Sequence, residues 1–269
     1  MSPYFQSGAV TLYHGDLFEV LPKLSGLVVD TLLTDPPYCS GAAGGGAKCD
    51  PRLKYCQNGQ NCGRVSFDGD NKDSISYGWW SMLWLKLCRR SLRETSYAMV
   101  FTDWRQLPTI TNAMQGADFI HRGTMAWDKG LASRAPHKGY IRHQCEFIPW
   151  GTLGKCANRS DTGPFPGCLR HQVRQDDKHH MTGKPTALLL ELVQICPAGG
   201  MVLDPFAGSG TTLVAAQASG RRAIGIELSE AYCEIAAKRL ELLASKGPES
   251  IARPQKRIAK RPPPPCSAV

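Results

Sequence analysis

The fold is decided by the stretch VLDPFAGSGTT at residues 202–212, which reads as a strand, a glycine turn and the start of a helix. Gly208 and Gly210 allow a positive φ and let another group approach the backbone closely. The first N–H groups of the helix then face a ligand bound in the turn. Residues 223–227 (AIGIE) read as the next strand and end on Glu227, at a distance that suits a carboxylate gripping ribose hydroxyls. These features predict an α/β fold that binds a nucleotide-like ligand at the carboxyl edge of its sheet.

A second informative stretch is VVDTLLTDPPY at residues 28–38. Its first seven residues are largely apolar and β-branched, as in a strand buried on both faces, and the proline pair then ends the strand and stiffens the backbone. The carboxylate of Asp35, the carbonyl of Pro36 and the ring of Tyr38 are therefore expected at the edge of the sheet, where an exocyclic amine of a planar base would find two acceptors and a face to stack on. Taken alone, the tetrapeptide also fits a strand stopped by prolines with a tyrosine on the surface.

With both stretches in view, the chain resembles the amino-methyltransferases of DNA that use S-adenosyl-L-methionine, over about residues 12–243. DPPY at 35–38 matches their catalytic motif, and DPFAGSGTT at 204–212 matches their cofactor loop. The catalytic motif comes first, which is the permuted motif order of the class called β, many of whose members belong to bacterial or phage restriction–modification or orphan methylation systems. The resemblance implies a Rossmann-like methyltransferase fold, with a mostly parallel twisted sheet, one antiparallel strand and helices on both faces.

The resemblance also implies roles for individual residues. The implied catalytic residues are Asp35, Pro36, Pro37 and Tyr38. The implied cofactor-binding residues are Asp16, Lys184, Asp204, Phe206, Gly208, Gly210, Thr211 and Glu227. A helix cap is an equally good interpretation of Asp16, and for Lys184 a plain cap competes with a bond to the carboxylate of the cofactor. No metal is implied.

The implied reaction is direct methyl transfer to the N6 amine of adenine in duplex DNA, after the base has been flipped out of the helix. Asp35 and the Pro36 carbonyl would each accept one N–H of the amine, which localises its lone pair and points it at the sulfonium methyl group. Aspartate at the first motif position favours adenine by resemblance, and the N4 amine of cytosine stays open. The remaining alternatives are a methyltransferase of RNA or of a protein glutamine, which more often begins the tetrapeptide with asparagine, and a DNA-binding protein that has lost catalysis.

Length and composition agree with an enzyme of this kind. The 269 residues fit one α/β domain with insertions, and the sequence contains neither an apolar run that could span a bilayer nor a secretory signal. Eleven cysteines without an export signal indicate a reducing compartment, so we expect the bacterial cytoplasm, in association with the nucleoid, and no membrane partner. The resemblance adds double-stranded DNA as the partner, and it leaves open a homodimer and a cognate restriction endonuclease.

The net charge of +9 is unevenly distributed. Residues 246–269 contain six basic residues and one acid, a net +5, and residues 121–180 contain ten basic residues and five acids, also a net +5. The rest of the chain sums to −1, so the presumed catalytic core is nearly neutral. A local basic stretch suits a phosphate backbone, although a solvated surface with an ordinary charge excess gives the same pattern.

The sequence is accordingly divided into a catalytic domain, residues 1–245, and a disordered, basic, proline-rich tail, residues 246–269. Within the domain, residues 39–71 are predicted to form a mobile loop, and residues 151–180, which lose their periodicity, are predicted to be the DNA-recognition insert. Cys49, Cys56 and Cys62, with Cys39 upstream, invite a zinc interpretation. Their spacing is wider than that of ordinary zinc knuckles and no histidine lies nearby, so unpaired thiols are the default.

Periodicity predicts the remaining elements. Strands are expected at 9–13, 97–101, 121–127 and 144–150, the last two as a reversed pair, and helices at 77–92, 107–114, 187–196 and 230–243. In the helix 77–92, Trp80, Leu83, Trp84 and Leu87 form an apolar stripe, which predicts that the tryptophans belong to the core.

Overall fold

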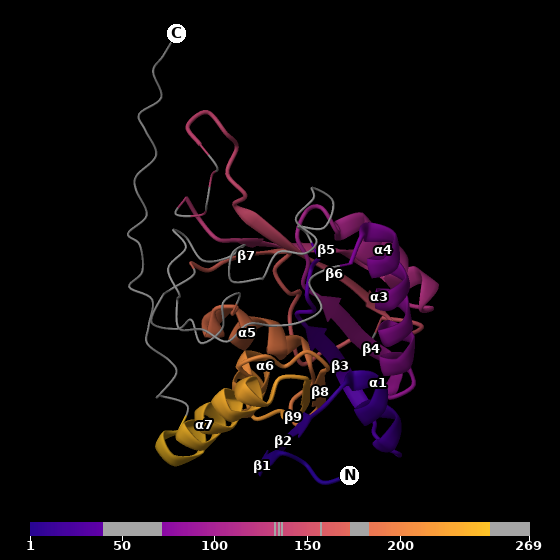
Figure 1. Ribbon diagram of the computed structural model, residues 1–269, viewed down its shortest axis with the longest axis vertical. Coiled ribbons are helices and arrows are strands. Elements are labelled where there is room, and N and C mark those ends of the chain that lie inside the picture. The colour runs from indigo at the N-terminus through magenta and orange to yellow at the C-terminus, as the bar shows by residue number, and fades with distance from the viewer. Residues whose placement is uncertain are drawn as a thin grey trace.

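The computed structural model describes residues 1–39, 72–131, 133, 135, 137–156, 158–172 and 183–247. They form one sheet with helices on both faces (Figure 1). The strands are β1 (Phe5–Ser7), β2 (Val10–His14), β3 (Val29–Thr34), β4 (Leu92–Val100), β5 (Ile120–Asp128), β6 (Cys145–Thr152), β7 (Cys168–Arg170), β8 (Met201–Asp204) and β9 (Arg222–Glu227). The helices are α1 (Leu17–Val20), η1 (Leu21–Lys23), α3 (Ser74–Arg89), α4 (Leu107–Gly116), α5 (Thr186–Leu192), η5 (Val193–Ile195), α6 (Thr211–Ala218) and α7 (Glu230–Lys246).

The strand order of the sheet is β1-β2-β9-β8-β3-β4-β6-β5-β7. The run from β2 to β4 is parallel throughout, and β6 is antiparallel to both of its neighbours. The predicted fold class is thereby confirmed, and the short β1 is a second strand that opposes the main direction. Because β8 pairs with β3 in parallel, the glycine turn after β8 and the tetrapeptide after β3 meet at the carboxyl edge of the sheet.

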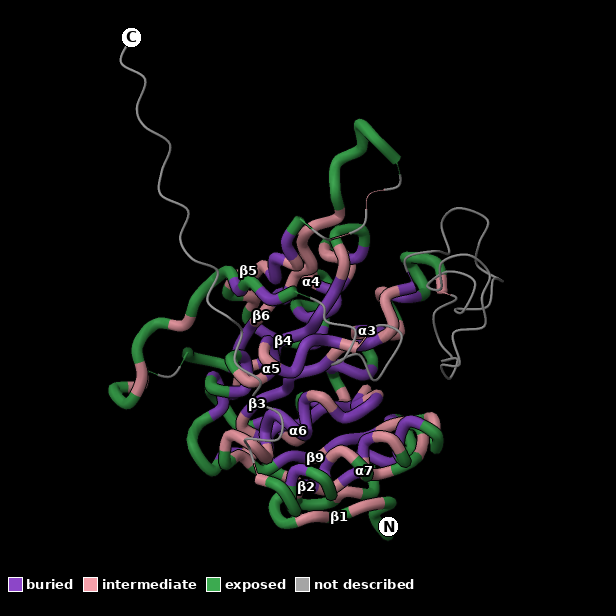
Figure 2. Tube along the Cα trace, turned by 90° about the vertical axis from the view of Figure 1, so that its left-hand side faces the viewer, coloured by how far each residue is buried: buried purple, intermediate pink, exposed green. Residues whose placement is uncertain are grey.

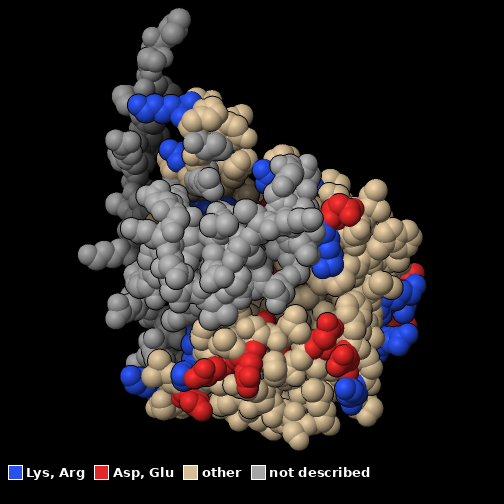
Figure 3. Space-filling model, in the orientation of Figure 1, with Lys and Arg blue, Asp and Glu red and all other residues tan. Residues whose placement is uncertain are grey.

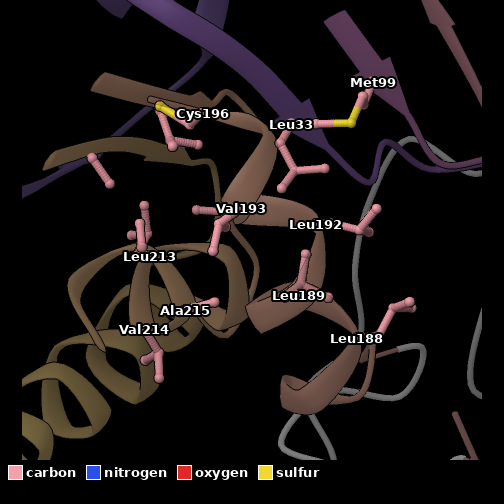
Figure 4. Close-up of a cluster of buried hydrophobic side chains, with 14 of the residues drawn as sticks. Leu33, Met99, Leu188, Leu189, Leu192, Val193, Cys196, Leu213, Val214 and Ala215 are labelled. Carbon is pink, nitrogen blue, oxygen red and sulfur yellow. The ribbon is translucent and has the colours of Figure 1, made fainter. Parts of the chain in front are cut away.

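Two buried clusters attach the helices to the two faces of the sheet. On one face, Leu33 and Met99 pack with apolar side chains of α5 and α6, such as Leu189 and Val214 (Figure 4). On the other face, Leu32 packs with α3 and α4. Leu32 and Leu33 serve opposite faces because successive side chains of a strand alternate, and β3 is therefore buried on both sides, as predicted. Figure 2 shows this burial concentrated along the central strands.

The predicted elements are all present, and the structure adds β1, a longer β4 and β7. β4 begins at Leu92, earlier than predicted, because a bulge between the Val29–Leu92 and Thr31–Tyr97 pairs, with Thr95 at φ +73°, lets a polar run continue the strand. β7 lies inside the stretch that was expected to be aperiodic, and it pairs with β5 at the sheet edge.

The buried face of α3 differs from the predicted stripe at one position. Trp84 is fully buried and Trp80 and Leu87 pack half-buried against the same cluster, whereas Leu83 is 55% exposed. The fully buried residues of the helix are Tyr77, Ser81, Trp84, Leu85 and Cys88. Because this helix is apolar on more than one side, its spacing alone did not determine which residues turn toward the sheet.

Several predictions fall on residues outside the described ranges. They concern the mobile loop beyond Cys39, with Cys49, Cys56 and Cys62, the end of the predicted insert at 173–180, and the tail beyond Gly247. Among the described residues, no group of His, Cys, Asp and Glu side chains is arranged to hold a metal ion. Within the same ranges, no helix combines the length and apolar character needed to cross a membrane.

Candidate active site

Asp35 follows β3 directly, in the middle of the carboxyl edge. The N–H of Phe101 donates to the carbonyl of Thr34 at 2.9 Å, so the pairing of β3 with the chain after β4 continues up to the residue before Asp35. Beyond the two prolines, the hydroxyl of Tyr38 donates to Oε2 of Glu146 at 3.0 Å. Because β6 is antiparallel, its first residues lie at this same edge, and the tetrapeptide is held against them.

The ammonium group of Lys184 lies against Asp35. Its Nζ is 2.5 Å from Oδ2 of Asp35 and 3.5 Å from Oε2 of Glu146, and the lysine side chain is only 6% exposed. Nζ also lies 5.1 Å from the ring centroid of Tyr38, within the range of a cation–π contact. Helix α5 has Pro185 at its N-cap and no side-chain cap, so Lys184 does not take the capping role that was one of its two interpretations.

Glu146 and Lys129 complete this group, and the sequence interpretation missed both. Lys129 Nζ lies 3.1 Å from Glu146 Oε1, and both side chains are largely buried. Asp35, Lys129, Glu146 and Lys184 thus form a charge cluster of two carboxylates and two ammonium groups. One signal was present in the sequence: Glu146 is the single acid in the largely apolar strand CEFIPWGT, and a buried charge there requires a partner.

The charge cluster determines the protonation of its members. Burial raises the pKa of Asp35, the ammonium group of Lys184 opposes that shift, and the carboxylate of Glu146 adds to it. Burial also acts to raise the pKa of Glu146, but Lys184 and Lys129 outweigh it, and the pKa lies below the usual value. Burial acts to lower the pKa of Lys184, whereas Asp35 and Glu146 raise it above the usual value. Near neutral pH, Glu146 is therefore ionised and Lys184 is charged, and Lys184 favours the ionised form of Asp35.

One oxygen of Asp35 is an unused acceptor. Oδ1 is buried and has no hydrogen-bond partner within the described part of the chain, whereas Oδ2 is held by Lys184. A buried acceptor without a donor is unfavourable by about 1–3 kcal/mol. A donor that reaches this oxygen would remove the cost, so the carboxylate presents a fixed acceptor without a donor at the edge of the sheet.

Asp204 connects the glycine loop to the strand of Asp35. Its Oδ1 accepts from the hydroxyl of Thr34 at 2.7 Å and from the N–H of Phe206 at 3.2 Å. Burial raises the pKa of Asp204 to about 6, although hydrogen bonds from Thr34 and Thr212 oppose the shift. The ring of Phe206 in turn packs edge-on against Trp84, with centroids 5.2 Å apart.

The glycine loop and the acid after β9 form the neighbouring part of the edge. The N–H of Gly208 donates to Oε2 of Glu227 at 2.7 Å, and the N–H of Ser229 donates to Oε1 at 2.8 Å. Gly210 has φ +78°, and a Cβ at this position would lie only 2.7 Å from the Cβ of Ala236 in α7. Both conditions require glycine, so the sequence interpretation of this turn agrees with its geometry.

Two further predicted residues lie at the same edge. Asp16 is the N-cap of α1, where Oδ1 accepts from the N–H of Phe18 at 2.7 Å, and the N–H of Gly15 donates to the carbonyl of Glu227 at 2.9 Å. Thr211 begins α6, and its hydroxyl accepts from Arg239 at 3.0 Å. The structure therefore brings the two motifs together from opposite ends of the chain, with Lys184 on the catalytic side.

Comparison with known sequences gives consistent matches. The profile of the N6/N4 family described as DNA methylase matches residues 29–238. The chain is 33% identical over 227 residues to YubD of Escherichia coli (strain K12), a methylase by name, across 84% of this chain and 88% of that protein. It is 28% identical over 255 residues to the type II methyltransferase M.HinfI of Haemophilus influenzae, across 86% of this chain and 68% of that protein.

Solved structures resemble the chain in fold. The M1.HpyAVI–SAM complex superposes with a TM-score of 0.64 at 22% identity, covering 86% of this chain and 98% of that one. The PvuII DNA methyltransferase, described as cytosine-N4-specific, superposes with a TM-score of 0.65 at 15% identity, covering 93% and 94%. At these identities the likeness concerns the fold alone.

Proposed function

The chain belongs to the N6/N4 DNA methylase family, and we propose that it methylates the N6 amine of adenine in duplex DNA at a specific sequence. The observation that carries this proposal is the buried Oδ1 of Asp35, an acceptor without a donor at the sheet edge that the glycine loop shares. An exocyclic amine supplies the missing donor. Duplex DNA hides that amine, so the base has to leave the stack to reach the edge of the sheet.

The cofactor is S-adenosyl-L-methionine, which supplies an electrophilic methyl group on a sulfonium centre. The residues present fit such a molecule, because the turn at Gly208, with φ +51°, and the carboxylate of Glu227 lie together at the carboxyl edge of the sheet. We assign the ribose hydroxyls to Glu227, and the other cofactor contacts to Asp16, Asp204, Phe206, Gly208, Gly210 and Thr211. Lys184 is assigned to the catalytic carboxylate, since its ammonium group is already held by Asp35 and Glu146.

The residues of the tetrapeptide act by positioning and electrostatics. Asp35 Oδ1 and the Pro36 carbonyl each accept one N–H of the target amine, so that its lone pair is no longer delocalised into the ring. The carboxylate also stabilises the positive charge that develops on the amine nitrogen. Tyr38, whose hydroxyl is fixed by Glu146, stacks on the base, and Pro37 shapes the wall of the pocket.

Two further parts of the proposal concern which base is methylated and which residues recognise the target sequence. Aspartate at position 35 supports adenine over cytosine, and the N4 amine of cytosine is chemically close enough to be the alternative. We propose that residues 151–180 read the target sequence and that the basic tail, residues 246–269, adds affinity for the phosphate backbone regardless of sequence.

The test is single-molecule methylome sequencing of methyl-free bacterial DNA after expression of the full chain. N6-methyladenine at one short motif is the expected result, and it would identify the base and the recognition site together. N4-methylcytosine would retain the mechanism and change the base. Cofactor binding without methylation of any DNA would overturn the proposal, and RNA and protein from the same cells would then be assayed for the methyl group.

Lys184→Met is expected to move the acidic limb of the pH profile of kcat/KM to higher pH by at least about one unit. The ammonium group lowers the pKa of Asp35, so its loss raises that pKa further and increases the protonated fraction of the carboxyl at a given pH. A protonated carboxyl is a poor acceptor for the amine, and activity should recover as the pH rises. Lys238→Met, on the exposed surface of α7, is the matched control. An unchanged profile with a lower melting temperature alone would mean that Lys184 only stabilises the fold.

A further inference from the structure

A largely exposed group of aromatic, aliphatic and basic side chains lies on two segments that lead away from the charge cluster. It comes from the chain between β4 and α4 and from the loop between β5 and β6, residues 129–144. We call it the rim cluster, and its members are Trp104, Arg105, Tyr140, Ile141, Arg142 and His143.

Ring contacts join the two segments of the rim cluster. The rings of Trp104 and His143 stack with centroids 6.1 Å apart and an interplanar angle of 15°. The guanidinium of Arg105 lies 4.7 Å from the centroid of Trp104, and the ring of Tyr140 meets His143 at 5.6 Å. These contacts arrange the side chains into one surface rather than leaving them separately solvated.

This surface is unusually apolar for an exposed loop. Ile141 is 86% exposed, Trp104 is 50% exposed and Tyr140 is 44% exposed. In Figure 2 the β5–β6 loop is the exposed projection at the top of the body, and Figure 3 shows Lys and Arg side chains on it. Residues 129–144 include four Lys or Arg residues and no acid. Arg105, on the neighbouring segment, pairs with Asp103 at 3.4 Å and is 46% exposed. Clustered exposed apolar groups mark interaction sites, and the excess of Lys and Arg in the loop indicates an anionic partner.

The loop is anchored directly to the active site. It begins at Lys129, whose Nζ pairs with Glu146 of the charge cluster at 3.1 Å, and its base is closed by a 2.9 Å bond from the N–H of Lys129 to the carbonyl of Gln144. Three residues before Trp104, the ring of Phe101 lies 5.1 Å from Nζ of Lys184. Both segments of the rim cluster are therefore connected, through short stretches of chain, to residues that contact the charge cluster.

We propose that the rim cluster binds duplex DNA around the flipped base, an inference that rests on the proposed function. Arg105 and Arg142 contact the phosphates of the strand, and Tyr140 and Ile141, at the tip of the loop, fill the space that the target base leaves in the stack. Removing a base from the stack costs a few kcal/mol, and apolar wedges that replace its stacking reduce this cost. The same insertion removes exposed apolar surface of the protein from water.

The proposal is tested with the full chain, S-adenosylhomocysteine and a duplex that carries the motif found by methylome sequencing, with 2-aminopurine at or beside the target position. The charge variant is Arg105→Gln with Arg142→Gln, and the tip variant is Tyr140→Ala with Ile141→Ser. The matched controls on α7, at the opposite end of the molecule in Figure 1, are Lys238→Gln and Leu242→Ser.

The charge variant should bind the duplex about tenfold more weakly, and the slope of log Kd against log salt should fall by about two, one for each lost phosphate contact. The tip variant should no longer show the rise in 2-aminopurine fluorescence, and its single-turnover rate should fall about tenfold. A mispaired target base should restore both, because a mispaired base costs less free energy to flip. Unchanged cofactor affinity would show that both variants are folded.

The rim proposal alone would be overturned if both variants kept affinity, salt slope and fluorescence within twofold of the wild type and of the controls. Failure of the wild-type chain to methylate any DNA would instead overturn the function on which it rests.

Discussion

Asp35→Ala is expected to reduce the rate of methyl transfer by about 1,000-fold or more while the affinity for S-adenosylmethionine changes little. The variant removes the proposed acceptor of the target amine and the charge that, in the proposed mechanism, stabilises the amine in the transition state. The cofactor contacts that we propose come mainly from the loop after β8 and from Glu227, which the substitution does not touch. Single-turnover methyl incorporation and calorimetric titration with the cofactor separate the two effects.

The control for this prediction is Glu94→Ala, which removes an exposed carboxylate from β4 at a distance from the edge. Asp35→Asn is a useful second variant, because it keeps the shape of the side chain and one acceptor while removing the charge. It should fall between the wild type and Asp35→Ala in rate. Normal methylation by Asp35→Ala would show that the catalytic assignment is wrong.

Gly210→Val is expected to weaken binding of S-adenosylmethionine by about 100-fold or more, which corresponds to roughly 2.7 kcal/mol. A side chain here meets two obstacles, since φ is +78° and the added Cβ would lie 2.7 Å from the Cβ of Ala236. Either the glycine turn or helix α7 has to move, and the N–H groups that surround the cofactor move with it. Equilibrium binding of the cofactor, measured by calorimetry, is the appropriate test.

Gly220→Val is the matched control. Gly220 has a similar φ of +69°, but no atom lies within 4 Å of the position that its Cβ would take. It should therefore lose about 1–2 kcal/mol of folding stability from backbone strain and keep its affinity for the cofactor. Equal loss of affinity in the two variants would mean that strain alone, rather than the packing of the turn against α7, accounts for the effect.

The sequence by itself determined the parts of this protein that depend on local pattern. Steric limits on a few adjacent residues account for the strands at 28–34 and 202–204, for the proline stop and for the glycine turn. The order of the two motifs is read directly from the sequence. Since parallel strands share one carboxyl edge, these local features also predicted that the two motifs would meet. The turn at Gly210 needs glycine for the reason that the sequence indicated.

Only the tertiary structure decided the partners of the catalytic carboxylate. Lys184 lies 149 positions from Asp35 in the sequence, and Glu146 and Lys129 come from β6 and the end of β5, where no local pattern indicates a shared site. The same holds for the early start of β4 at a bulge, for the edge strand β7 and for the face that α3 turns inward. A local pattern limits the conformation of a segment, whereas the pairing of buried charges and the choice of a buried face depend on long-range packing that brings distant residues into contact.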